Sequence, residues 1–198
     1  MPWPPRILAS FAKLPDAPSE ADFHGPYNKL LHTIFPSDSE FTVVPQYLPG
    51  PRDSPNSVFT LEVLFVDRPV LILKLWSPGH LRYPSTREAA DLQIRYRIRD
   101  LAGQPQSSIY QVGVLTAFGS IDDCPLPVLH AVSAMGTQLC FYKKPRNEFI
   151  VPSRLPAHPE LETDTAPEAR WSCSILEEEG EQKFRRMVDE IKQGCAAL

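Results

Sequence analysis

The chain has 198 residues, 42% of them hydrophobic and 22% charged, which is enough for one domain with an ordinary core. Its formal net charge of −4 argues against a histone-like basic surface, so phosphate binding would need a local basic patch. No run reaches the roughly 18 apolar residues of a membrane span, and the start lacks a signal-peptide pattern. We therefore expect a soluble intracellular protein, cytoplasmic or nuclear, with no membrane partner.

The cysteines and prolines indicate which structural features to expect in this protein. The four cysteines are far apart and form no CxxC pair, which disfavours a zinc site and indicates reduced thiols. The 22 prolines are about twice the usual share. Because proline lacks an N–H donor and fixes φ, its clusters predict long loops and strand ends between compact elements.

The N-terminal quarter predicts an arm, a helix and a strand. Residues 1–22 are rich in proline and polar side chains and are expected to form an arm before a single domain over residues 23–198. A short amphipathic helix is predicted over residues 26–36, where apolar side chains recur at helical spacing. Residues 40–48 are rich in β formers and predict a strand, with Pro45 at an edge or bulge.

The clearest strand signal is a hairpin over residues 58–76, VFTLEVLFVDRPVLILKLW. Apolar residues alternate in its first half, a polar break follows at Asp67 and Arg68, and a second apolar run completes it. Lys74 and Trp76 are two residues apart, so their side chains leave the same face of the second strand. The function depends on whether that face is core or active site.

A helix is predicted after this hairpin, although its sequence also alternates as a strand would. Ser85 and Glu88 have the S-x-x-E spacing of a capping box. Helix is favoured because apolar side chains recur there at steps of three and four residues. These side chains belong to Ala90, Ile94, Ile98 and Leu101.

The second half of the chain predicts one more hairpin and a closing helix. Residues 103–123 have no clear period and are expected to be an insertion, with an extra strand as the alternative. A hairpin is predicted over residues 129–142, because a Met-Gly pair there suits a tight turn. A long proline-rich loop over residues 143–169 precedes an amphipathic helix over residues 181–193, which Gly194 would end.

These elements predict an α+β or three-layer α/β/α domain with a mixed sheet. An αβββαβ order is the core of the restriction-endonuclease-like, or PD-(D/E)xK, fold, here with an added C-terminal helix. In that fold a carboxylate on the second strand and an E-x-K on the third hold a divalent metal, and the lysine steadies the attacking water. This chain offers Glu62 on the second strand and Lys74-Leu75-Trp76 on the third.

Five strings carry a family resemblance: FHGPYNKLLHTIFP, FTVVPQYLP, LEVLFVDRPVLILKLWSP, REAADLQIRYRIRDL and CPLPVLHAVSAMGTQLCFY. They resemble a family of uncharacterised basidiomycete fungal proteins, whose third strand reads RPVLILELKPP and whose next helix carries AD-x-Q-x-R-x-R. The resemblance covers roughly residues 23–142. It implies a PD-(D/E)xK-like fold and leaves the activity open.

The chain departs from that family at the centre of the motif. Lys74 and Trp76 stand where E-x-K is expected, so a Mg²⁺ site would place like charge against like. Glu62 is either a surviving metal ligand or a solvent-facing strand residue. Lys74 is either part of a degenerate catalytic site or a snorkelling lysine, paired with Glu62 across the hairpin. Trp76 is favoured as a packing aromatic.

The helix after the motif supplies the remaining candidates. Gln93 is expected to face the degenerate site, and Arg95, Arg97 and Arg99 are candidate nucleic-acid contacts, since guanidinium binds phosphate bidentately. The alternative is a solvated helix face with an internal pair between Asp91 and Arg95.

Three functions remain open from the sequence. The leading one is a PD-(D/E)xK-like module with a degenerate metal centre and no cofactor, which binds DNA or RNA through its basic helix or has a regulatory role. The second is an active Mg²⁺-dependent nuclease that combines Glu62 with Glu40 or Asp53. The third is a protein-interaction module that uses the proline-rich loops and the last helix. The histidines show no HExxH spacing and no serine lies in G-x-S-x-G, which leaves other hydrolase chemistry unsupported.

Overall fold

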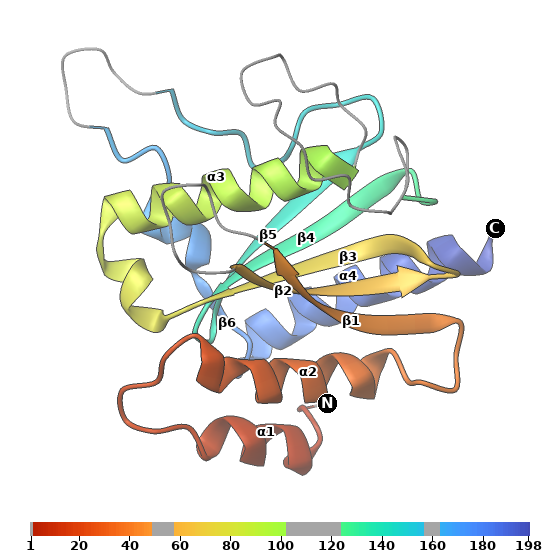
Figure 1. The fold of residues 1–198 in the computed structure, drawn as a ribbon, viewed down its shortest axis with the longest axis horizontal. Helices are drawn as coiled ribbons and strands as arrows, with labels where there is room; N and C mark the ends of the chain where they lie inside the picture. The colour runs from red at the N-terminus through yellow and green to blue at the C-terminus, as the bar shows by residue number, and fades with distance from the viewer. Residues whose placement is uncertain (1, 49–57, 102–123, 157–162) are drawn as a thin grey trace.

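The computed structural model describes residues 2–48, 58–101, 124–156 and 163–198, in which six strands form one mixed, open sheet with four α-helices around it. The fold is α+β, and the strands follow one another across the sheet in chain order (Figure 1). The strands are β1 (Phe41–Leu48), β2 (Val58–Phe65), β3 (Arg68–Trp76), β4 (Val128–Met135), β5 (Gln138–Pro145) and β6 (Cys173–Ser174). The helices are α1 (Pro5–Ala12), α2 (His24–Ile34), α3 (Pro84–Leu101) and α4 (Glu178–Ala196).

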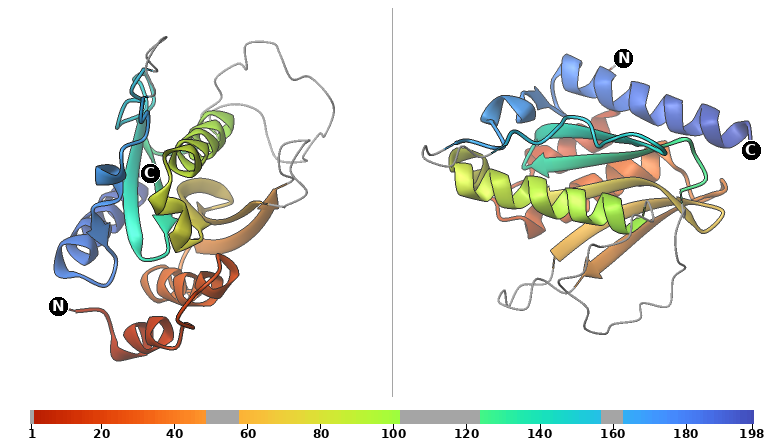
Figure 2. Two further views of the ribbon diagram at one scale, coloured as in Figure 1. Left: turned by 90° about the vertical axis from the view of Figure 1, so that its left-hand side faces the viewer. Right: turned by 90° about the horizontal axis from the view of Figure 1, so that it is seen from above.

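The sheet is mixed because it contains one parallel pair of strands among the antiparallel ones. Neighbouring strands are antiparallel except β3 and β4, which are parallel. A parallel pair needs a crossover between its strands, and α3 lies in that connection. Helix α3 covers one face of the sheet, while α2 and α4 lie on the other (Figures 1 and 2).

The predicted hairpin of β2 and β3 is confirmed, with a shift at its turn. Val66 and Asp67 form the turn with positive φ values of 46° and 63°, and Arg68 already pairs with Phe65. A register shift follows between Val63 and Leu64. Every side chain of β3 after Arg68 is buried, as expected for a strand with a layer on each face.

Residues 2–22 contribute to the core. Trp3, Ile7 and Phe11 are buried, and α1 carries the last two on one face. The Phe11 ring meets Tyr27 of α2 edge-on at 5.3 Å between centroids. The Trp3 indole N–H donates to the carbonyl of Ile175 at 2.7 Å, which ties the N-terminus to the segment before α4.

The helix and hairpin predicted around the β3–β4 crossover are also confirmed. Helix α3 buries Ala90, Ile94, Ile98 and Leu101. The glycine of the β4–β5 turn, Gly136, has φ +63°, and a Cβ there would lie 2.7 Å from Pro78 Cγ. That turn therefore favours glycine for both its backbone conformation and its space.

Two expectations about helix ends are wrong, and one short strand is new. Helix α4 is longer than predicted and runs through Gly194, where a Cβ would lie 2.9 Å from Leu126 Cδ2; close packing, not helix termination, explains this glycine. The predicted capping box of Ser85 and Glu88 is wrong, because α3 starts at Pro84 and Glu88 pairs with Arg154. The two-residue strand β6 was not predicted, and the expected insertion over residues 103–123 lies outside the described residues.

Within the described ranges, no helix combines the length and the apolar character that crossing a bilayer requires.

Candidate functional site

The face of the sheet under α3 carries the residues that the sequence singled out. Glu62 lies on β2, and Lys74 and Trp76 lie on β3. The side chains of Glu62 and Lys74 contact α3, and that of Trp76 contacts His80 in the segment before α3. Side chains alternate along a strand, so Thr60 shares this face and stands directly opposite Lys74. We refer to Glu62, Lys74 and Trp76 with their α3 partners Gln93 and Arg97 as the β2–β3 centre.

Glu62 is bound internally by an arginine of α3. Its side chain is buried, and its Oε1 accepts a 2.7 Å hydrogen bond from Nε of Arg97 and lies 2.7 Å from Nη2. Burial raises the pKa of Glu62, and the Arg97 guanidinium acts in the opposite direction by attraction. The predicted cross-hairpin pair with Lys74 is wrong, because the turn at Val66 and the register shift place Glu62 opposite Ile72.

Lys74 is also buried and uses a different partner on the same helix. Its ammonium donates to Oε1 of Gln93 and lies 4.6 Å from the centroid of the Trp76 ring. Burial lowers the pKa of Lys74 to about 7, and attraction to the Glu20 carboxylate acts in the opposite direction. Burial in turn raises the pKa of Glu20, which Lys74 partly offsets.

Trp76 is the last residue of β3 and lies between Lys74 and His80. The side chain is 8% exposed, and its ring lies 5.5 Å from that of His80 at a tilt of 44°. Its indole N–H has no hydrogen-bond partner among the described residues. The ring supplies a π face to the Lys74 ammonium, which is the packing role favoured from the sequence, combined with a cation–π contact.

The residues of the β2–β3 centre do not fit a Mg²⁺ ion. Such a site needs several oxygen ligands, usually with two carboxylates, but Glu62 is bound by Arg97, and the β3 side chains beside it are a lysine and an indole, which offer no oxygen. Glu40 stands level with Val66, four residues along the strand from Glu62, or about 13 Å away at the usual rise. Asp53 lies outside the described residues. Among the residues that the structure describes, no cluster of three His, Cys, Asp or Glu side chains could hold a metal.

The row of α3 that holds Arg95 serves a structural network. Arg95 is 6% exposed, and its Nε donates to Asp91 Oδ2 at 2.7 Å, which confirms the internal pair considered from the sequence. The other oxygen of Asp91 accepts from the Tyr142 hydroxyl at 2.9 Å and from Arg170 at 3.1 Å. Sequence reasoning missed Tyr142 and Arg170 as partners, since they lie 51 and 79 residues from Asp91.

The three predicted arginines thus point to three different places. Arg97 faces Glu62, Arg95 lies buried beside Asp91, and Arg99 is exposed on the flank of α3. Gln93 faces the β2–β3 centre, as predicted, and Arg97, four residues further on and predicted as a nucleic-acid contact, faces it as well.

Comparisons of this chain with protein families, with curated proteins and with solved structures find no match.

Proposed function

We propose that this domain is a PD-(D/E)xK-like module whose metal centre has been replaced by internal side-chain pairs, and that it binds nucleic acid without cleaving it. The observation that carries the proposal is the bond between Glu62 and Arg97. It occupies the carboxylate that a metal would need, with a partner that brings its own positive charge.

The order of elements supports the fold part of this proposal. Helix α2 is followed by the antiparallel strands β1, β2 and β3, then by α3 and by β4 parallel to β3. The β2–β3 centre lies on the second and third strands of that order, under the crossover helix, where the fold family holds its metal. Under the proposed fold, Lys74 and Trp76 stand where the metal-binding E-x-K would be, which supports a lost metal centre.

The charges of the β2–β3 centre support the loss of metal binding. A divalent cation in the β2–β3 centre would meet the positive charge of Arg97, and below about pH 7 that of Lys74 as well, in a place where screening by water is weak. Lys74 and Arg97 hydrogen-bond to Gln93 and Glu62, so both side chains have internal partners without a metal. Such an arrangement stabilises a fold and offers no activated water.

Cleavage assays on the wild-type protein provide the first test. Plasmid, single-stranded and branched DNA are incubated with the protein in Mg²⁺ or Mn²⁺, and retention of DNA is measured in parallel at rising salt. We expect salt-sensitive retention and no cleavage. Cleavage that Glu62→Ala abolishes would overturn the proposal in favour of a rearranged nuclease, and absence of any retention would remove the nucleic-acid role.

Rebuilding the motif provides the second test. Lys74→Glu with Trp76→Lys restores E-x-K, and Arg97→Met added to this pair also frees the Glu62 carboxylate. We expect calorimetry to detect Mg²⁺ binding in the triple variant, weaker binding in the double variant, and none in the wild type. Circular dichroism establishes that each variant is folded. A folded triple variant without Mg²⁺ binding would show that these positions do not form a metal centre.

A further inference from the structure

A basic groove lies between α3 and the loop that follows β5. Its cavity has a volume of about 710 Å³. Five basic side chains and one carboxylate line it, in a chain whose formal net charge is −4. These charged residues are Arg95, Arg99, Lys144, Arg146, Arg154 and Glu148. We call this feature the α3 groove.

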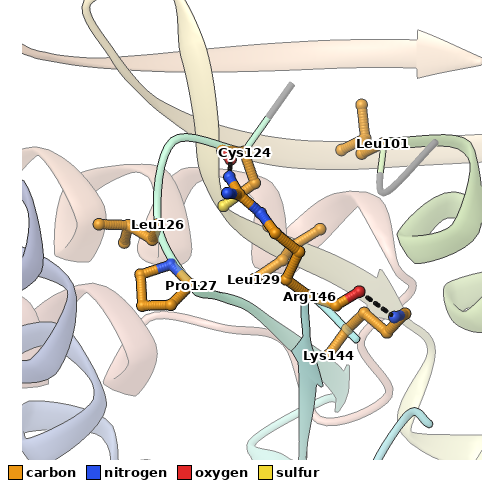
Figure 3. Close-up of a pocket in the computed structure, with 7 residues that line it drawn as sticks. All are labelled: Leu101, Cys124, Leu126, Pro127, Leu129, Lys144 and Arg146. Carbon is orange, nitrogen blue, oxygen red and sulfur yellow. Dashed lines mark hydrogen bonds between the residues drawn. The ribbon is translucent and has the colours of Figure 1, made fainter. Parts of the chain in front are cut away.

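The loop wall of the α3 groove is held in one shape by its own backbone. Lys143 and Val151 exchange two N–H to carbonyl hydrogen bonds of 2.8 Å, which close the loop between them. Inside it, the buried Lys144 ammonium donates to the carbonyls of Pro145, Arg146 and Glu148 at 2.9, 3.3 and 2.8 Å. Figure 3 shows the bond from Lys144 to Arg146. These bonds connect the two ends of the loop and its interior, and so support the shape of this wall.

The loop wall is also tied to α3. Arg95 of α3 donates to the carbonyl of Pro152 at 2.6 Å. Arg170 donates to the carbonyl of Ser153 at the same distance and also to Asp91 of α3, so it links the loop to the helix. Arg154 pairs with Glu88 of α3 across the same gap. These three arginines are engaged in holding the walls together.

Arg99 and Arg146 remain available for a ligand. Both are exposed, and no carboxylate lies within ion-pair distance of either in the described part of the chain. Arg146 makes one long contact, 3.5 Å, to the carbonyl of Cys124, as Figure 3 shows. The ammonium of Lys144 also lacks a carboxylate partner among the described residues, so the groove keeps an uncompensated positive charge that attracts an anion.

Two exposed aromatic rings lie on opposite walls of the α3 groove. Phe149 of the loop is 92% exposed, and Tyr96 of α3 is 57% exposed. Rings beside unpaired arginines suit a ligand that carries both negative charge and flat apolar faces. A single-stranded nucleic acid has these two properties, because its bases are free to stack while its phosphates meet cations. A duplex keeps its bases stacked on one another.

We propose that the α3 groove binds single-stranded nucleic acid, with Arg99 and Arg146 contacting phosphates and Phe149 and Tyr96 stacking on bases. The inference rests on the proposed function for the class of its ligand. It places that ligand on the flank of α3 away from Gln93 and the β2–β3 centre.

The first measurement is fluorescence anisotropy with labelled dT and U oligonucleotides of about 12 nucleotides and with a duplex of the same length. We expect the single strands to bind more tightly than the duplex. Arg99→Ala with Arg146→Ala should weaken binding and lower the slope of log Kd against log salt by about 1.4, since each single-strand phosphate contact contributes about 0.7. Lys13→Ala with Arg186→Ala, which removes two exposed cations elsewhere, is the matched control.

The second measurement tests the aromatic rings. Phe149→Ala with Tyr96→Ala should weaken single-strand binding at least about tenfold, because each stacked base contributes substantially, while the salt slope stays unchanged. Tyr83→Ala, which removes a 54% exposed ring outside the groove, should leave affinity unchanged. All substituted side chains are exposed, so we expect the variants to stay folded.

Several results would overturn the inference. Binding that the arginine pair and its control affect equally would mean that the groove is not the site. Equal affinity for duplex, with no effect of the aromatic pair, would exclude single-strand stacking. Binding of an acidic peptide but no oligonucleotide would assign the groove to a protein ligand. Metal-dependent cleavage that requires Glu62 would instead refute the degenerate centre and leave the groove measurements to stand separately.

Discussion

Replacing Lys74 with methionine should change how the stability of this protein depends on pH. The Lys74 ammonium is buried with an amide and an indole as its neighbours, and burial lowers its pKa from the ordinary 10.5 to about 7. Methionine has a similar length and no charge, so Lys74→Met removes the titration and keeps most of the packing.

The sign and size of the effect follow from proton linkage. Between pH 10.5 and about 7 the unfolded chain takes up the Lys74 proton and the folded protein does not, so stability falls as the pH falls through that window. The full difference corresponds to about 5 kcal/mol, at about 1.4 kcal/mol for each tenfold change in proton affinity. Between pH 7 and 9 the wild type should therefore gain about 2 kcal/mol relative to Lys74→Met.

Urea unfolding of both proteins, in reductant and followed by circular dichroism from pH 6 to 9, measures this difference. Other groups titrate in both proteins, so the difference between the two profiles reports Lys74 together with its attraction to Glu20. The variant should be the more stable protein at pH 6, and its advantage should shrink as the pH rises. Parallel stability profiles would refute the idea that Lys74 is held in a desolvated site.

Three further substitutions test the Asp91 network and the packing of the α4 side of the fold. Asp91→Asn leaves the buried Arg95 and the half-buried Arg170 without their carboxylate and should lower the free energy of unfolding by about 3 kcal/mol; an unchanged urea midpoint would contradict the network. Gly180→Ala places a Cβ 1.9 Å from the carbonyl oxygen of Ser174 and should cost at least about 2 kcal/mol, whereas Gly25→Ala, with nothing within 4 Å, should be tolerated. Trp3→Phe removes an indole donor to a buried carbonyl and should cost about 1 kcal/mol in the same assay; no change in stability would show that this bond contributes nothing.

Local patterns were enough to predict most of the strands and helices of this fold. The apolar stripe that includes Ile94 and Ile98 outweighed a strand-like alternation in the same residues, because packing of one face decides the helix. The positive φ of Gly136 likewise follows from its place between two short apolar runs. The local pattern gave a wrong prediction at Gly194, because a glycine near a helix end suggests that the helix stops there. The close packing of Leu126 explains this glycine, and Leu126 lies 68 residues earlier in the chain.

The candidate site was less predictable, because its contacts depend on register and on the rotation of one helix. Spacing shows that Gln93 and Arg97 share a side of α3, but the neighbouring row with Arg95 has the same spacing. Which row faces Glu62 depends on how α3 sits on the sheet. The residue opposite Lys74 also differed from the expected one, because the hairpin turn lies at Val66 and Asp67, one residue earlier than the polar break suggested.

The contacts that join the groove walls have a consequence for folding. Arg95 reaches a carbonyl 57 residues away, and Arg170 reaches Asp91 over 79 residues, so these bonds close large loops. Forming such contacts costs conformational entropy, because the entropy of closing a loop increases with its length. A ligand that binds only the completed groove offsets part of that cost, and the protein's resistance to unfolding should rise with ligand concentration.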